Sequence, residues 1–171
     1  MDKLDRMSVG EFKRSDKYPI VVVLDNVRSM NNIGSVFRTC DAFRIDKIYL
    51  CGITAQPPHK DIEKTALGAT QSVDWTYFNS TKEAVGELIE NDYFVFSIEQ
   101  VEQSIMLNEF NPSDYKKIAF VFGNEVMGVE QEVIDLCHGC VEIPQFGTKH
   151  SLNISVSVGI VLWQIISSLI C

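Results

Sequence analysis

The chain is poor in positive charge. Its 171 residues hold 15 Lys and Arg against 23 Asp and Glu, which gives a formal net charge of −8 at pH 7. This balance argues against generic nucleic-acid binding through bulk charge. The deficit is uneven, because residues 1–47 hold nine basic and seven acidic side chains, whereas residues 83–135 hold two and twelve. A polyanion would therefore have to approach the N-terminal part of the chain.

Cysteines are few and follow no framework. There are five, an odd number without regular spacing, which argues against a disulfide scaffold and is typical of a reducing compartment. Cys137 and Cys140 form a CxxC motif, but the other three supply no second pair for a structural zinc. Val141 stands where a c-type haem site needs histidine. We therefore expect packed structural thiols and no metal.

Targeting signals are also lacking. The charged N-terminus has no apolar signal-peptide core, so we expect a cytoplasmic protein. Residues 151–171 carry no charge and are as long as a membrane span, but seven of the 21 are Ser, Asn or Gln. We interpret this stretch as a buried or subunit-interface helix and expect no membrane contact.

What is present is an alternation of apolar runs and amphipathic stretches. Strands are predicted over 20–24, 47–51, 73–78, 93–98, 118–122 and 140–143, and helices from Asn31 or Asn32 as cap to Phe43, then over 61–69, 81–91, 130–137 and 151–170. Hairpin dipeptides are missing between the strands, so we predict an α/β fold with a mostly parallel sheet flanked by helices. Residues 20–171 then form one domain.

Residues 1–19 precede that domain as a polar N-terminal leader. Two interpretations stay open for it. The leader is either disordered or loosely docked on the domain, or it is an arm in which Lys13, Arg14 and Lys17 contact phosphates.

Three loops that follow predicted strands carry the polar and glycine-rich sequences. In the first, Arg38 lies six positions after Asn32, so we expect both near the loop end of their helix. Composition alone makes Asn32 a helix cap and Arg38 a solvated charge. The second, Gly123–Gly128, lets the backbone approach a ligand, but it is neither a P-loop nor a GxGxxG turn. The third, Ile143–Ser155, gathers backbone N–H groups and hydroxyls beside a strand end, which suits a small polar ligand.

Together these loops resemble the three motifs of SpoU/TrmH-type RNA 2′-O-ribose methyltransferases, which belong to the SPOUT class. The motifs are N-x-G-x-x-x-R at Asn32–Arg38, G-x-E-x-x-G at Gly123–Gly128 and I-P-x-x-G-x-x-x-S-L-N-x-S at Ile143–Ser155. Their order and spacing match from about residue 20 onward, and TALGA at Thr65–Ala69 is also similar. The chain departs from the pattern at Arg44, where the family usually has glycine. Two interpretations stay open for Arg44: it adds a phosphate contact, or it is only a solvated charge.

The resemblance implies a single SpoU-type methyltransferase domain whose C-terminal part is threaded into a deep trefoil knot. It implies S-adenosylmethionine as cofactor and a homodimer that brings the first-motif arginine near the cofactor site, with the last helix in the interface. The implied cofactor-binding residues are Ser97, Ile98, Gly123, Gly128, Ile143, Gln145 and Leu152. The implied catalytic residues are Asn32, Arg38, Glu125, Ser151 and Asn153.

The expected activity is methyl transfer to a ribose 2′-OH of RNA, with tRNA ahead of rRNA. The resemblance assigns the position of Arg38 as the base, but a guanidinium with a pKa above ~12 is a poor base. We prefer the interpretation in which Arg38 pins a phosphate and stabilises the forming alkoxide. Asn32, Ser151 and Asn153 then orient the ribose, and Glu125 fixes Arg38 or its loop. There are two alternatives. The first is a non-catalytic RNA-binding module. The second is a base methyltransferase, although the third motif argues against it.

Overall fold

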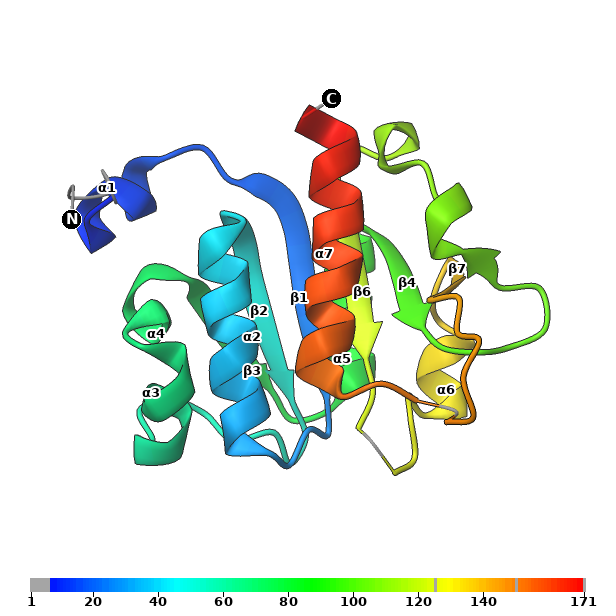
Figure 1. The fold of residues 1–171 in the computed structure, drawn as a ribbon, viewed down its shortest axis with the longest axis horizontal. Coiled ribbons are helices and arrows are strands. Elements are labelled where there is room, and N and C mark those ends of the chain that lie inside the picture. Colours follow the sequence, from blue (N-terminus) through cyan, green and yellow to red (C-terminus); the bar gives the residue numbers. More distant parts are fainter. Residues whose placement is uncertain (1–6, 125, 150, 171) are drawn as a thin grey trace.

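A seven-stranded parallel sheet forms the centre of the computed structural model, which describes residues 7–124, 126–149 and 151–170 (Figure 1). The strands are β1 Tyr18–Asp25, β2 Ile45–Cys51, β3 Asp74–Phe78, β4 Phe94–Ile98, β5 Ile105–Met106, β6 Ile118–Phe122 and β7 Gly139–Glu142. They lie in the order β3-β2-β1-β6-β4-β7-β5, and each neighbouring pair is parallel. The predicted α/β fold with a mostly parallel sheet is confirmed. The short edge strand β5 is additional, in a stretch that has no strand pattern.

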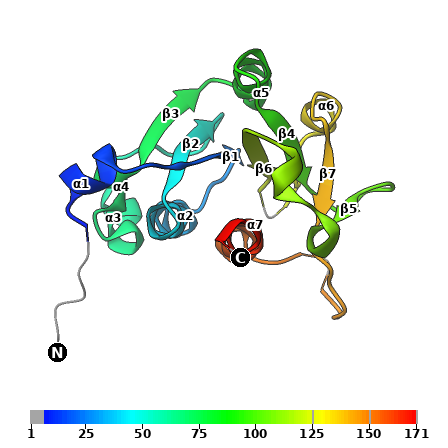
Figure 2. The same ribbon diagram turned by 90° about the horizontal axis from the view of Figure 1, so that it is seen from above.

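Helices cover both faces of the sheet. They are α1 Val9–Arg14, α2 Met30–Ala42, α3 Lys60–Ala66, α4 Ala69–Ser72, α5 Thr81–Glu90, α6 Gln131–Ile134 and α7 Ile154–Ile170. Figure 2 shows α2, α3 and α7 on one face, with α5 and α6 on the other. Two 3₁₀ turns, Leu107–Glu109 and Pro112–Asp114, pack near α7. No helix of the described ranges is long and apolar enough to span a bilayer.

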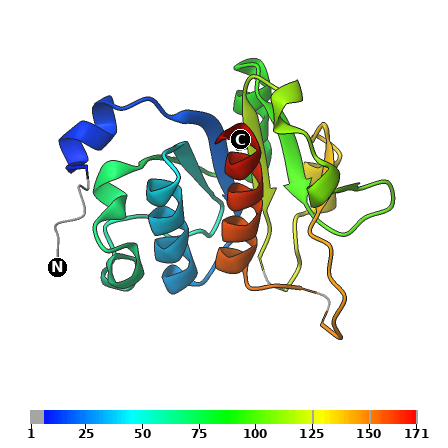
Figure 3. The same cartoon turned by 45° about the horizontal axis from the view of Figure 1, so that its top comes forward.

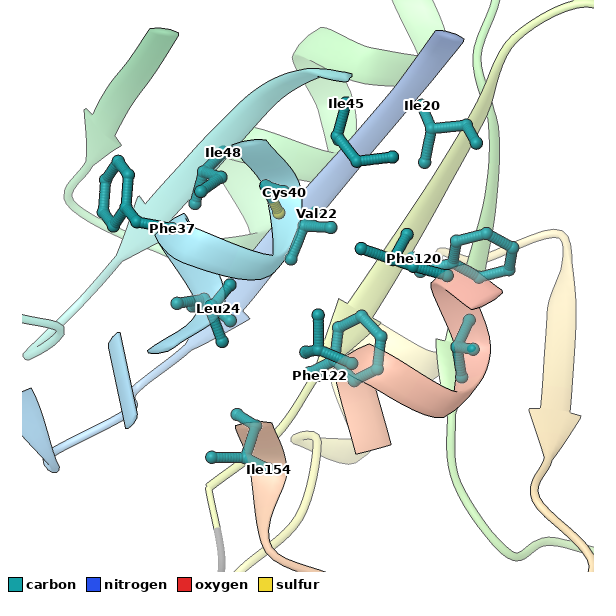
Figure 4. Packing of buried hydrophobic residues seen from close by; sticks show 14 of the residues in the cluster. Ile20, Val22, Leu24, Phe37, Cys40, Ile45, Ile48, Phe120, Phe122 and Ile154 are labelled. Atoms are coloured by element: carbon teal, nitrogen blue, oxygen red, sulfur yellow. The ribbon is translucent and has the colours of Figure 1, made fainter. Parts of the chain in front are cut away.

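The core explains why the central strands are continuous apolar runs. Along β1, Ile20, Val22 and Leu24 pack into the cluster beneath α2 and α7 (Figure 4), whereas Val21 and Val23 pack into the cluster beneath α5. Successive side chains of a strand point to opposite faces, so a strand covered on both sides has no polar face.

The predicted leader is in part a docked helix. Ser8 and Glu11 form a capping box at the start of α1, and Phe12 is only 5% exposed. The ammonium of Lys17 donates to the carbonyl oxygens of Phe12 and Ser15, and Lys13 lies 3.7 Å from a carboxylate oxygen of Asp74. Two of the three cations of the predicted phosphate arm thus contact the protein itself.

Several helix ends differ from the prediction. Ser29, rather than Asn31 or Asn32, caps α2, because its hydroxyl accepts from the backbone N–H of Asn32 at 3.3 Å. The helix predicted over 61–69 is two helices, since Leu67 and Gly68 adopt left-handed φ angles of 49° and 90°. The last helix begins at Ile154 rather than at residue 151. Helix α6 is also shorter than the predicted 130–137.

Candidate functional site

A cavity of about 380 Å³ lies where the loops after β4, β6 and β7 meet. In a parallel α/β sheet the carboxyl ends of the strands are the usual place for a ligand, because the loops converge there. Figure 3 shows the segment after β7 as an extended stretch that returns toward the start of α7. The described lining residues are Ile98, Glu99, Gln100, Phe122, Gly123, Asn124, Val126, Met127, Gly128, Ile143, Gln145, Ser151, Leu152, Ile154 and Ser157.

The loop after β6 folds back tightly on itself. The N–H of Gly128 donates to the carbonyl oxygen of Asn124 at 2.9 Å, and the Asn124 side chain accepts from the N–H groups of Val126 and Met127. A Cβ added at Gly123 would lie 2.0 Å from the carbonyl carbon of Gly128, so only glycine fits there. The loop thus presents backbone to the cavity.

Glu99 holds the end of this loop. Its carboxylate follows β4 and accepts from the N–H of Val129 at 2.7 Å. Among the described residues that line the cavity, Glu99 alone carries a carboxylate. Glu99 was not among the predicted site residues, although an acidic residue directly after an apolar strand is a visible signal in the sequence.

The first and third motifs meet beside the cavity. The side-chain amide of Asn153 donates to the side-chain oxygen of Asn32 at 3.2 Å, across 121 positions of sequence. The side-chain oxygen of Asn153 also accepts from the N–H of Ser155 at 2.9 Å, as a helix cap does. Two motifs far apart in the chain are therefore fixed to one another within a single subunit.

Six of the seven residues predicted to bind cofactor line the cavity: Ile98, Gly123, Gly128, Ile143, Gln145 and Leu152. The seventh, Ser97, is fully buried, with its hydroxyl 2.9 Å from the sulfur of Cys140. Strand alternation explains this placement, because Ser97 points with Val95 to the face of the sheet beneath α5, whereas Ile98 points with Phe96 to the opposite face. Of the predicted catalytic residues, Ser151 lines the cavity and Glu125 lies outside the described residues.

Arg38 lies apart from this cavity. Its exposed side chain lines a second cavity, of about 550 Å³, between α1, the end of α2 and the turn from α3 to α4. The prediction that Asn32 and Arg38 lie together near the loop end of their helix is wrong. Six helical residues separate the two by about 9 Å along the axis and by about 120° around it. One subunit alone therefore does not bring Arg38 to the first cavity.

The CxxC segment is part of the packing. Burial, with a smaller contribution from the neighbouring Cys140, raises the pKa of the Cys137 thiol to about 12, so the thiol is protonated at neutral pH. Nδ1 of His138 accepts from the backbone N–H of Val95 at 3.0 Å. Among the described residues, no group of three His, Cys, Asp or Glu side chains is placed to hold a metal ion.

Comparison with known proteins identifies a family and several relatives that the chain resembles. Residues 19–163 match the model of the SpoU rRNA Methylase family. A tRNA (guanosine(18)-2′-O)-methyltransferase of Aquifex aeolicus is 32% identical over 85% of this chain and 67% of its own length. A tRNA (guanosine(18)-2′-O)-methyltransferase of Thermus thermophilus is 29% identical over 93% and 80%. A 23S rRNA (guanosine-2′-O-)-methyltransferase of Neisseria meningitidis is 28% identical over 84% and 56%.

Solved structures show the same fold. The Aquifex aeolicus TrmH/SpoU tRNA modifying enzyme superposes with a TM-score of 0.82 at 24% identity, over 94% of this chain and 80% of that one. The SpoU methyltransferase AviRb of Streptomyces viridochromogenes, in complex with AdoMet, gives 0.81 at 20% identity, over 92% and 63%.

Proposed function

The chain belongs to the SpoU rRNA methylase family, and we propose that it transfers a methyl group from S-adenosylmethionine to a ribose 2′-OH of RNA. The observation that carries this proposal is the cavity at the carboxyl ends of β4, β6 and β7, where the second and third motifs meet. The contact between Asn153 and Asn32 adds the first motif to the same place.

The residues of this cavity suit S-adenosylmethionine. Ile98, Ile143 and Leu152 provide apolar walls. The loop after β6 closes so tightly at Gly123 and Gly128 that a Cβ at either position would collide with the Gly128 backbone or the Glu99 carboxylate, so backbone lines this side of the cavity. Glu99 and Gln145 provide acceptors and donors for polar groups such as ribose hydroxyls. When bound, the cofactor supplies an electrophilic methyl group on a sulfonium that leaves as a neutral thioether.

The protein's task is then to align and activate the ribose hydroxyl. We propose that Asn32, Ser151 and Asn153 orient the ribose, and that Glu125 supports Arg38 or its loop. The hydroxyl oxygen takes the methyl group, and its proton passes to a neighbouring RNA phosphate or to water. Arg38 holds the phosphate and stabilises the negative charge that develops on the oxygen, because a guanidinium stays protonated.

We further propose that the chain works as a homodimer. In one subunit Arg38 lies on a different cavity from the motif loops. Helix α7 also exposes a stripe of apolar side chains at helical spacing, in which Val156, Ile160, Trp163 and Ile170 are 48%, 38%, 56% and 62% exposed. Pairing of this stripe with a second copy would cover it, and would let Arg38 of one subunit reach the first cavity of the other.

The thread of the C-terminal part also belongs to this proposal. Strand β7 pairs between β4 and β5, and the chain then returns across the sheet end to α7 beside α2. We propose that this return completes the deep trefoil knot that the family resemblance implies. We also propose that residues 20–171 form one domain that binds both RNA and cofactor. We place the protein in the cytoplasm, because a reducing compartment keeps its free cysteines Cys40, Cys51, Cys137 and Cys140 reduced.

Among RNA substrates we favour tRNA. Relatives from Aquifex aeolicus and Thermus thermophilus are named as tRNA methyltransferases, whereas the relative from Neisseria meningitidis is named for 23S rRNA. Methylation of rRNA is therefore the second candidate.

Mass spectrometry of nucleosides from cells that lack the gene tests the activity. One 2′-O-methylated nucleoside is expected to disappear from the tRNA fraction and to return when the wild-type chain is supplied. Loss from rRNA instead would select the second candidate. Unchanged profiles in both fractions would contradict the enzymatic function and favour an RNA-binding module.

A further inference from the structure

Arg44 occupies a position that glycine would fill with less strain. It follows Phe43, the C-cap of α2, and has a φ of +50°, in the left-handed region that residues with a Cβ disfavour. The turn itself is firmly fixed, because the N–H of Arg44 donates to the carbonyl oxygen of Asp41 at 3.1 Å and its carbonyl accepts from the N–H of Tyr18 at 3.0 Å. The backbone therefore places this guanidinium at some conformational cost.

The side chain that this turn places lies on the same cavity as Arg38. Among the described residues that line this cavity, Asp41 alone carries a carboxylate, and that carboxylate already accepts a hydrogen bond from the hydroxyl of Ser72. Within the described part of the chain, neither arginine has a carboxylate oxygen within 4.0 Å. Two guanidinium groups thus line one concave surface without an ion-pair partner from those residues.

The rest of this surface suits a nucleotide strand. Met7, Val9 and Leu67 line the cavity and are 53%, 43% and 66% exposed, so apolar contact area lies beside the two cations. Guanidinium groups match phosphate oxygens with paired N–H donors, and residues 1–47 are the segment with net positive charge. A phosphodiester strand fits this combination of charge and apolar surface.

We propose that Arg44 binds a backbone phosphate of the RNA substrate, next along the strand from the phosphate held by Arg38. The cavity between α1, α2 and the α3–α4 turn is then a phosphate subsite of the RNA. This inference rests on the proposed function, and it adds a residue at which the chain departs from the family pattern.

Salt-dependent binding of a fluorescent bulk tRNA pool tests the proposal, with wild type, Arg44→Gln and Arg44→Gly compared by anisotropy. Each lost phosphate contact lowers the slope of log K against log salt by about 0.7 to 0.9. Both variants are expected to lose this amount of slope, and to bind the tRNA about threefold to tenfold more weakly at low salt. Affinity for S-adenosylmethionine should not change. Lys82→Gln is the charge-matched control, because Lys82 lies on α5 and pairs with Glu132 on the opposite face.

The two variants distinguish the effect of losing the positive charge from the effect of relieving the strained backbone. Arg44→Gly removes the left-handed strain, so its Tm is expected to rise by about 2 °C, whereas Arg44→Gln should show no such rise. An unchanged salt slope in both variants would overturn the proposal. Loss of the dimer in gel filtration with an unchanged slope would instead assign Arg44 to a subunit contact, and would also overturn it. A wild-type chain that transfers no methyl group but shows the Arg44 slope effect would refute the proposed function alone.

Discussion

Arg38→Gln is expected to slow methyl transfer about 10²- to 10³-fold, the usual loss when a preorganised charge or donor at a developing oxyanion is removed. Binding of S-adenosylmethionine should stay near the wild-type level, because Arg38 is assigned to the RNA phosphate and to the charge that develops on the ribose oxygen, and not to the cofactor. Single-turnover transfer of labelled methyl groups to bulk tRNA measures the first quantity, and calorimetry with the cofactor measures the second.

Two further variants sharpen this result. Arg38→Lys keeps the charge but loses the planar fork, so it should recover only part of the rate. Lys82→Gln removes one positive charge from the opposite face of the sheet and should behave as wild type. Near-normal turnover of Arg38→Gln would rule out both the phosphate anchor and the oxyanion role.

Gly123→Ala is expected to weaken cofactor binding by about 100-fold or more, which corresponds to about 2.7 kcal/mol. The new methyl group would lie 2.0 Å from the carbonyl carbon of Gly128 and 2.3 Å from the amide nitrogen of Val129. Both atoms belong to backbone, which cannot turn away as a flexible side chain can, so the loop must move out of place. Overpacking of this kind typically costs about 1–3 kcal/mol, and the Tm should fall as well.

Gly86→Ala is the matched control for this substitution. Gly86 lies on α5, on the face of the sheet opposite α7 (Figure 2), and an added Cβ there meets no atom within 4 Å. It should bind S-adenosylmethionine like the wild-type chain in the same calorimetric titration. If Gly123→Ala also kept the wild-type Kd, the cavity at the carboxyl ends of β4, β6 and β7 would not be the cofactor site.

The central sheet could be predicted because its strands are buried on both faces. Runs such as Ile20–Leu24 and Ile118–Phe122 need no tertiary information to be recognised. Edges and ends were harder. Strand β5 has only two residues, and the break after α3 depends on the left-handed backbone of Leu67, a residue type that gives no such signal. The capping box at Ser8 and Glu11 was readable but stood in a polar leader.

The candidate site, like the fold, could be predicted only in part from the sequence. The glycine loop and the residues Ile143–Leu152 were identified through motifs whose spacing is carried by the sequence itself. Strand alternation places Ser97 on the face beneath α5 and Ile98 on the opposite face, where it lines the cavity. That one-residue distinction needs the exact register of the strand. The separation of Arg38 from the motif loops follows from helix geometry and tertiary packing together. Sequence separation alone could not show it.

Activity of a mixed dimer tests the central claim most directly. Arg38→Gln and Gly123→Ala subunits, co-expressed with two different tags and purified as the heterodimer, each carry one intact half of the site. If Arg38 of one subunit serves the cavity of the other, one of the two sites is complete, and the heterodimer should recover about half of the wild-type rate. A heterodimer as inactive as the two parent homodimers would contradict the shared site.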